Sequence, residues 1–366
     1  MKKLKIAQVG AIWESTPPKL YGGTERVVSA LTEELVKRGH NVTLFATGDS
    51  KTKAKLESVV PKPLYRQNIP WHNTGYPLMH LYNAFRQTGK FDLFHMHLNL
   101  PTDFIALSYV DFLKCPAIFT LHFNLPEADG PKPDQYMVLD LFSRLNFVSI
   151  SDFQRKIKSL NYAATVYNGV PIEKLKFSSL GGQNLAWLGR FTPDKGPKEA
   201  IEVALSLKKP IKLAGKLDQQ DRSVQGYYTK EIEPRLKANP KLVSYVGEVD
   251  DKKKSLFLGQ ARCLVNPINW DEPFGLVVPE ANACGTPVVA FARGAMPEII
   301  KDGVNGYLVS PGDLKGMAKA VKKILEMPEK EYEKLRLTSR QWVEDHFSIE
   351  KMVDGYEKVY LNIVGK

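Results

Sequence analysis

Two glutamates stand eight positions apart in the stretch "NWDEPFGLVVPEANACGTPVVAF", residues 269–291. A loop followed by a helix beginning near Phe274-Gly275 would place backbone N–H groups and the positive end of the helix dipole against a phosphate. Gly275 would let a ligand approach the backbone closely. Glu272 could then reach hydroxyl groups beyond the phosphate, and Glu280, about a turn and a half into the helix, could accept hydrogen bonds from two adjacent ribose hydroxyls. The spacing equally fits two surface acids favoured by the helix dipole.

A second stretch, "GRFTPDKG" at residues 189–196, carries two cations around a turn. Arg190 offers a planar guanidinium and Lys195 a mobile point charge, and both suit a diphosphate. The alternative is a Pro-Asp turn with solvated charges.

Both stretches follow predicted strands, in a chain where strands alternate with helices. Parallel sheets covered on both faces are expected from this alternation. The first series has strands at 4–10, 41–46, 91–97, 117–122 and 146–150, with helices near 24–39, 76–88, 102–114 and 134–143. The second has strands at 184–191, 211–215, 242–247 and 263–267, with helices from 197, near 227–238 and from 250. The Gly-, Ser- and Pro-rich segment 167–183 separates the series, so we expect two doubly wound domains with a ligand in the cleft between them.

Composition narrows the function classes. The 366 residues are 43% apolar, without a run long enough to span a membrane, and the first residues are typical of a strand rather than a signal peptide. Three cysteines without a C-x-x-C pair indicate a reducing cytoplasm. The net charge of +11 is spread along the chain, which argues against a nucleic-acid partner. The basic stretch 51–66 is interpreted as a solvated loop, and a weak peripheral contact with an anionic membrane stays open.

Cofactor signatures are missing from the sequence. Neither half begins with G-x-G-x-x-G, which disfavours a nicotinamide enzyme. No D-x-D pattern offers carboxylates for a divalent ion on a diphosphate, and "HMH" at 95–97 places two histidines on one face of a strand without a third ligand. We therefore expect neither a cofactor nor a metal.

The chain resembles the family 4 glycosyltransferases, which are retaining nucleotide-sugar enzymes of the GT-B fold. The resemblance runs almost the full length and rests on "YGGTERVV", "TLH" ending at His122, "YNGV" (167–170), "GRFTPDKG", "EPFGLVVPEANACGTPVVA" and "DGYEKVY". The E-x7-E pattern of Glu272 and Glu280, with its flanking residues, is the most specific of these.

The resemblance implies a role for each matching residue. Arg190 and Lys195 would hold the donor diphosphate, and Glu280 the ribose. The donor sugar and pyrophosphate would meet Glu272, Phe274, Gly275 and Leu276. Gly22 and Gly23 would form a loop for phosphate or acceptor, and His122 would lie at the sugar end. Residues 1–170 with a crossing helix at 346–366 would bind the acceptor, and residues 171–345 the donor.

The resemblance also implies a mechanism. The acceptor would attack from the face that the nucleotide leaves, the departing phosphate would take its proton, and no enzymic nucleophile or metal would be needed. A hexose from a UDP-sugar such as UDP-glucose is the expected donor, with the base read near 245–250. Segments 11–23, 49–75 and 123–135 would select a small-molecule, lipid or glycan acceptor. A sugar-phosphate synthase or phosphorylase of the same architecture, and a non-catalytic nucleotide-sugar-binding protein, remain alternatives.

Overall fold

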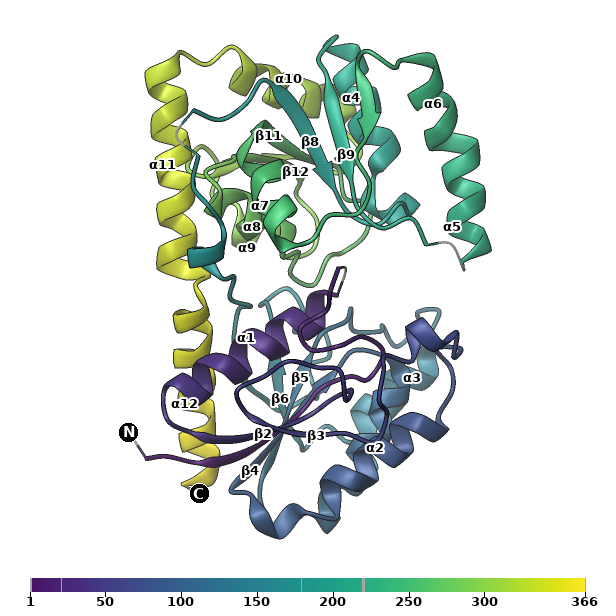
Figure 1. Cartoon of the computed structure of the whole chain (residues 1–366), viewed down its shortest axis with the longest axis vertical. Coiled ribbons are helices and arrows are strands. Elements are labelled where there is room, and N and C mark those ends of the chain that lie inside the picture. Colours follow the sequence, from purple (N-terminus) through teal and green to yellow (C-terminus); the bar gives the residue numbers. More distant parts are fainter. Residues whose placement is uncertain (1, 21, 179, 219–220, 366) are drawn as a thin grey trace. The chain divides into compact units, whose positions relative to one another are not determined.

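The computed structural model describes residues 2–20, 22–178, 180–218 and 221–365. Tyr21 of the "YGG" motif lies outside these residues. The chain divides into two compact units, Met1–Gly169 with Ile349–Lys366, and Val170–Ser348 (Figure 1). Each unit is a twisted parallel sheet with helices on both faces.

The first unit is built on a seven-stranded sheet in the order β3-β2-β1-β4-β5-β6-β7, with every pair parallel. The order reverses between β1 and β4, where ligands bind in sheets of this kind. The strands are β1 (Lys5–Val9), β2 (Asn41–Phe45), β3 (Lys55–Glu57), β4 (Leu93–Leu98), β5 (Ala117–Leu121), β6 (Asn146–Ser149) and β7 (Tyr162–Thr165).

Helices cover both faces of this sheet. They are α1 (Gly23–Lys37), α2 (Gly75–Phe85), α3 (Pro133–Leu141) and α12 (Ile349–Val364), with 3₁₀ segments η1 (Tyr65–Gln67), η2 (Thr88–Lys90) and η3 (Pro101–Phe112). The apolar stripe predicted for α1 is confirmed, because Val27, Val28, Leu31 and Leu35 are all buried. The helix ends before Gly39, whose φ of +88° suits the residue after a helix C-cap.

The C-terminal helix α12 lies in the first unit, against α1. Arg38, after the end of α1, donates to Asp354 at 2.7 Å and to Glu357 at 2.6 Å. His40 reaches the other carboxylate oxygen of Glu357 at 2.9 Å. These contacts join the two ends of the sequence in one unit.

The second unit has a six-stranded sheet in the order β10-β9-β8-β11-β12-β13, also parallel throughout. Its strands are β8 (Asn184–Leu188), β9 (Ile211–Ala214), β10 (Val243–Tyr245), β11 (Ala261–Asn266), β12 (Val288–Phe291) and β13 (Gly306–Val309). The order reverses between β8 and β11, so the segments that follow these two strands meet at one edge of the sheet. Those segments are the two stretches that carry Arg190, Lys195, Glu272 and Glu280.

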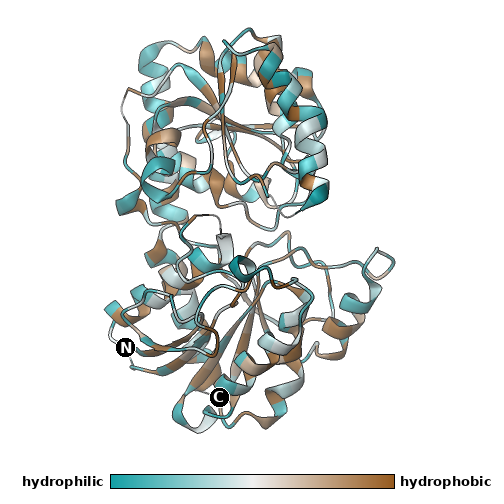
Figure 2. Ribbon diagram, turned by 45° about the vertical axis from the view of Figure 1, so that its right-hand side comes forward, coloured by the Kyte–Doolittle hydropathy of each residue, from teal (hydrophilic) through white to brown (hydrophobic). Residues whose placement is uncertain are grey.

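The second unit's helices complete the two layers. They are α4 (Pro197–Ser206), α5 (Arg222–Tyr227), α6 (Glu233–Ala238), α7 (Asp251–Gly259), α8 (Val277–Ala283), α9 (Met296–Ile299), α10 (Leu314–Leu325) and α11 (Glu329–His346), with η4 (Ile172–Lys174), η5 (Pro193–Lys195) and a π turn η6 (Tyr228–Ile232). Figure 2 shows apolar residues concentrated along the strands and hydrophilic residues on the outer sides of the helices, as expected for sheets buried on both faces.

Four local predictions were wrong in detail. Residues 101–112 form a 3₁₀ helix, and Phe104, Leu107 and Val110 stand at its three-residue period and pack on the core. The helix predicted near 227–238 begins at Arg222, where Asp221 caps it. It widens to a π turn before Pro234, which lacks the N–H that an α-helix needs.

The helix predicted from Phe274-Gly275 begins instead at Val277, because Gly275 has a φ of +89° that no α-helical residue adopts. Glu280 therefore lies in its first turn. The basic stretch 51–66 is not wholly a loop, because it contains the edge strand β3. Its lysines at 51, 53, 55 and 62 are nonetheless exposed.

Candidate active site

A tight turn after β8 fixes Lys195. The turn η5 ends at Lys195, whose carbonyl oxygen accepts a hydrogen bond from the indole nitrogen of Trp187 at 3.0 Å. Gly196 follows with a φ of +67°, and a Cβ there would lie 2.1 Å from the carbonyl oxygen of Pro267. Only glycine fits this close approach, and the turn is thereby held against the end of β11.

The side chains of Lys195 and Glu272 form an ion pair, so the structure brings together two residues that the sequence places in separate motifs. The indole nitrogen of Trp270 donates to the same carboxylate at 3.0 Å. The Lys195 ammonium also lies 4.7 Å from the centre of the Trp270 ring. Glu272 thus has its orientation set by two donors, and Trp270 is a member of the site to which sequence reasoning gave no role.

Backbone contacts hold the loop of Glu272 in place. Its carbonyl oxygen accepts from the N–H of Ala295 at 2.9 Å. A Cβ on Gly294, where φ is +59°, would lie 2.4 Å from both the nitrogen and the oxygen of Glu272. A Cβ on Gly275 would lie 2.8 Å from the Met296 side chain and 3.1 Å from that of Glu272. Two glycines therefore permit the close packing that positions this carboxylate.

Arg190 lies on the same strand-end segment but remains more exposed. Its guanidinium is 3.9 Å from the Asp194 carboxylate, and 42% of its side chain is accessible. The charge is therefore in partial contact with solvent, and an ion pair at this distance and exposure is weak.

Glu280 is buried in α8 and forms an ion pair with Lys254 of α7. The Lys254 ammonium has a second, longer contact of 3.5 Å to Asp251. A buried carboxylate needs such a partner because desolvation of an isolated charge is costly. Sequence reasoning missed Lys254, which lies within the helix predicted from residue 250. The signal was helical spacing, since Lys254 and the buried Leu258 share one face of α7.

Phe274 and Leu276 take structural positions. The Phe274 ring is buried edge-to-face on Phe347, with ring centres 5.7 Å apart, and Leu276 is the N-cap residue of α8. The side chain of Phe274 belongs to the core, so only its backbone could meet a donor. The proposed base-reading segment begins at Tyr245, whose hydroxyl donates to the Gly215 carbonyl at 2.9 Å.

In the first unit, His122 follows the end of β5 and meets His97 of β4. His122 Nε2 and His97 Nδ1 are 3.0 Å apart. The prediction that His95 and His97 share a face of the strand is confirmed, with ring centres 4.0 Å apart. Burial lowers the pKa of His122 to about 3 and that of His97 well below its ordinary value, so both rings are neutral.

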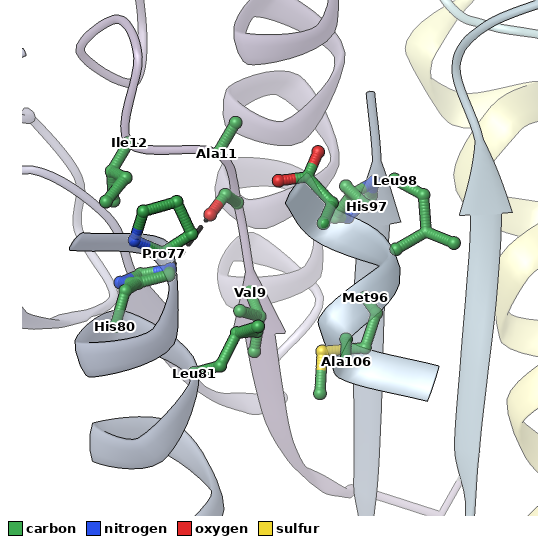
Figure 3. Close-up of a pocket in the computed structure, with 12 residues that line it drawn as sticks. Val9, Ala11, Ile12, Pro77, His80, Leu81, Met96, His97, Leu98 and Ala106 are labelled. Atoms are coloured by element: carbon green, nitrogen blue, oxygen red, sulfur yellow. Dashed lines mark hydrogen bonds between the residues drawn. The ribbon is translucent and has the colours of Figure 1, made fainter. Parts of the chain in front are cut away.

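A pocket opens at the carboxyl ends of β1 and β4, where the sheet order reverses (Figure 3). His80 of α2 lies in its wall and donates from Nε2 to the Gly10 carbonyl at 3.0 Å, and burial lowers its pKa to about 4. Asp103 accepts from the N–H groups of Asn99 and Leu100 at 2.8 Å, and burial raises its pKa to about 6. The lining residues are Val9, Gly10, Ala11, Ile12, Pro77, His80, Leu81, Met96, His97, Leu98, Asp103 and Ala106.

The glycine pair lies at the start of α1, with Gly22 as N-cap and Gly23 as the first helical residue. A Cβ on Gly22 would lie 2.7 Å from Pro18 and 3.0 Å from a carboxyl oxygen of Glu25. Burial, with a smaller contribution from the charges of Glu14 and Asp103, raises the pKa of Glu25 to about 7. The surroundings of this loop are therefore acidic.

Among the residues that the structure describes, no group of three or more histidine, cysteine or acidic side chains is placed to hold a metal ion. No helix in the same part of the chain has the length and apolar content to cross a bilayer.

Both units of the chain match families of known proteins. Residues 179–342 match the family described as glycosyl transferases group 1, and residues 21–174 match glycosyltransferase family 4. An uncharacterized glycosyltransferase of Methanocaldococcus jannaschii is 28% identical over 363 residues, which cover 94% of this chain and 96% of that protein. The N-acetyl-alpha-D-glucosaminyl L-malate synthase of Bacillus anthracis is 23% identical over 376 residues, 94% of each protein.

Solved structures show the same architecture. Sucrose-phosphate synthase from Thermosynechococcus elongatus matches with a TM-score of 0.82 at 19% identity, covering 99% of this chain and 100% of that one. HepE of Anabaena, solved in complex with UDP-glucose, matches with a TM-score of 0.74 at 18% identity and covers 99% and 100%. With two family profiles spanning both units and this agreement in fold, the chain belongs to the group 1, family 4 glycosyltransferases and has the GT-B fold.

Proposed function

We propose that this glycosyltransferase moves a hexose from a UDP-sugar, most simply UDP-glucose, to a hydroxyl acceptor, with retention of the anomeric configuration and without a metal ion. The observation that carries the proposal is the pairing of each glutamate of the E-x7-E motif with a lysine, Glu272 with Lys195 and Glu280 with Lys254. Lys195, Glu272 and Glu280 lie on the segments that follow β8 and β11, the strands at the switch point of the second sheet, where nucleotides bind in such folds. Lys254 lies on α7, which packs beside α8.

Each ion pair would bind a different part of the donor. Lys195 and Arg190, whose side chain is 42% accessible, would supply positive charge for a diphosphate. Glu280, held by Lys254, would accept hydrogen bonds from the two ribose hydroxyls. Glu272, held by Lys195 and Trp270, would accept from hydroxyls of the sugar. The UDP-glucose bound in the Anabaena protein of the same fold supports a donor of this class.

Stabilisation of the leaving diphosphate is the main catalytic contribution under this proposal. Positive charge that is already in place costs little reorganisation when the negative charge develops. Glu272 is a weakened nucleophile because an ammonium and an indole N–H both bind its Oε2 atom and stabilise the carboxylate charge. Front-face attack, with the departing phosphate taking the acceptor proton, accounts for retention without a covalent sugar–enzyme intermediate.

An uncharged hydroxyl acceptor fits the first unit better than a phosphate does. Glu25 and Asp103 lie beside the glycine loop and the pocket, and the nearby charge of Glu14 adds to theirs. These carboxyls would repel an anionic acceptor once ionised, which disfavours a sugar-phosphate synthase or phosphorylase activity.

Thermal unfolding with UDP, GDP, ADP and NAD, each with and without EDTA, tests the donor assignment. A ligand present at about 100 times its dissociation constant adds ~2.7 kcal/mol to the free energy of unfolding. UDP should raise the melting temperature, and EDTA should not abolish the effect. Glu280→Ala and Arg190→Ala should each weaken UDP binding about 10- to 150-fold, the value of one lost charge-assisted hydrogen bond.

Glu326→Ala is the matched control, because Glu326 forms an exposed ion pair with Lys322 on α10. UDP binding unchanged in both donor-site variants would show that the assignment is wrong. A shift with NAD alone would point to a different enzyme class. Retention is tested by the anomeric proton coupling of the product from UDP-glucose, and a β-linked product would overturn it.

A further inference from the structure

Seven polar side chains are joined by hydrogen bonds through the interior of the first unit. They come from three neighbouring strands, from the residue after β5 and from the C-terminal helix α12. In bonded order they are His122, His97, Gln8, Tyr360, His95, Thr120 and Tyr356.

The hydrogen-bonded series that runs from His122 to Tyr360 includes the side-chain amide of Gln8. His97 contacts His122 through Nδ1 at 3.0 Å and the Gln8 amide oxygen through Nε2 at 2.8 Å. The Gln8 amide nitrogen donates to the Tyr360 hydroxyl at 3.2 Å. Gln8 and Tyr360 are 352 positions apart in the sequence, so only the docking of α12 on the sheet creates this contact.

The far half continues from the same hydroxyl. Tyr360 lies 2.8 Å from Nδ1 of His95, whose Nε2 lies 2.7 Å from the Thr120 hydroxyl. Thr120 and Tyr356 are 3.0 Å apart, and Tyr356 is the last member. Six of the seven residues are at most 3% exposed, and only His122 is partly accessible. The hydrogen-bonded series therefore reaches the surface at His122.

Burial of so many polar groups is costly unless every one is bonded. The opposite face of the same strands carries Ala7, Val9, Phe94, Met96 and Phe119, an apolar core without such a chain. A sheet face of this fold can therefore be packed with apolar side chains alone. The polar chain calls for an explanation other than packing.

With the Gln8 amide oxygen facing His97 and its nitrogen facing Tyr360, donor and acceptor matching assigns the proton positions. The Gln8 amide oxygen can only accept, so His97 carries its proton on Nε2. A neutral imidazole then has a bare Nδ1, which can only accept from His122. His122 must therefore carry its proton on Nε2 and present a bare Nδ1. Burial keeps both rings neutral, in agreement with this assignment.

We propose that Gln8 and His97 are positioning residues that hold His122 as its Nε2–H tautomer, so that Nδ1 accepts a hydrogen bond from a substrate hydroxyl. The inference rests on the proposed function and on the expectation, drawn from the family resemblance, that His122 lies at the sugar end of the donor. The second nitrogen of a histidine is commonly set in this way by the bond that the first one makes.

The substitution Gln8→Glu provides a sharp test because the two side chains have nearly the same shape. A buried carboxylate beside His97 would favour the imidazolium form of that ring, with protons on both nitrogens. His97 Nδ1 would then donate to His122 Nε2, and the proton of His122 would move to Nδ1. The substrate hydroxyl would lose its acceptor, and we expect kcat to fall about three- to tenfold.

Tyr356→Phe is the matched control, since it removes a buried hydroxyl at the other end of the chain. Nitrogen-15 NMR of histidine-labelled full-length protein reports each tautomer, and His122→Asn identifies the His122 signal. We expect the Nε2–H form in the parent and in Tyr356→Phe, and the Nδ1–H form in Gln8→Glu. An Nδ1–H form in the parent would overturn the proposal.

Kinetics and nucleotide binding complete the test. UDP should stabilise Gln8→Glu as it does the parent, because the proposed UDP contacts belong to the second unit, and Tyr356→Phe should keep the parent kcat. A changed tautomer without a change in kcat or KM would refute the substrate contact. Loss of the UDP effect in Gln8→Glu would indicate a general structural role and also overturn the proposal. Failure of the parent to bind any nucleotide would instead refute the proposed function, and the NMR result would still stand.

Discussion

The buried ion pair between Lys254 and Glu280 permits a quantitative prediction. Lys254→Met keeps an unbranched side chain of similar length, so the packing of the methylene groups is largely retained while the charge is lost. Glu280 would then be left buried without its principal cation. The variant isolates the electrostatic contribution of the pair.

The size of the effect follows from burial. Removal of one partner of a buried ion pair costs about 3–5 kcal/mol. The side chains of Lys254 and Glu280 are 10% and 9% accessible, so we take the lower end, ~3 kcal/mol. In a unit of this size, ~1 kcal/mol moves the melting temperature by about 2–4 °C. The second unit should therefore melt about 6–12 °C lower.

A double-mutant cycle measures the pair itself. Lys254→Met, Glu280→Gln and the double variant are compared by thermal unfolding and by UDP titration. The double variant should be less destabilised than the sum of the single variants by at least ~1.5 kcal/mol, because it leaves no uncompensated charge. Lys322→Met, which breaks an exposed pair with Glu326, should change the stability by less than ~0.5 kcal/mol.

Additive losses would refute this reasoning. If the double variant equals the sum of the single ones to within ~0.5 kcal/mol, the two side chains are not coupled. If Lys254→Met leaves UDP binding unchanged while Glu280→Gln weakens it, Lys254 stabilises the fold without positioning the ribose contact.

Two further predictions concern backbone strain and pH. Gly294→Ala should lower the free energy of unfolding by about 2–5 kcal/mol and weaken donor binding, since its Cβ would collide with the Glu272 backbone. Gly303→Ala is also at positive φ but in open space, so it should lower the free energy of unfolding by only about 1–2 kcal/mol and leave binding unchanged. Equal effects of the two substitutions would contradict the steric argument. Burial raises the pKa of Glu25 from 4.5 to about 7, so between these pH values the folded state holds a proton that the unfolded state has lost. The stability that protonated Glu25 contributes below pH 4.5 is therefore lost as the pH rises to 7. Glu25→Gln should gain about 3 kcal/mol relative to the parent over this range in denaturant titrations, and a constant difference would refute the assignment.

The fold was predictable because parallel sheets impose a simple pattern. Strands such as β12 and β5 are buried along their whole length and are largely apolar, and helices such as α1 carry a single apolar stripe. Departures occurred where one residue overrode the pattern. Gly275 delayed the start of α8, and Pro234 widened the helix before α6.

The candidate site was predictable only in part. The sequence by itself singled out Glu272, Glu280, Arg190 and Lys195 as candidates, because their motifs follow predicted strands and their side chains suit phosphate and hydroxyl groups. The ion pair of Lys195 with Glu272 joins two such motifs at adjacent strand ends, which the topology of a doubly wound sheet brings together.

Only the tertiary structure decided which partners these groups have. Lys254 meets Glu280 because α7 packs beside α8, and Gln8 meets Tyr360 because α12 returns to the first sheet. Both contacts join buried polar groups. Folding removes these groups from water, and each would be costly to bury without its partner. A local sequence pattern records which face of an element is buried, but not which polar group of another element will lie against it.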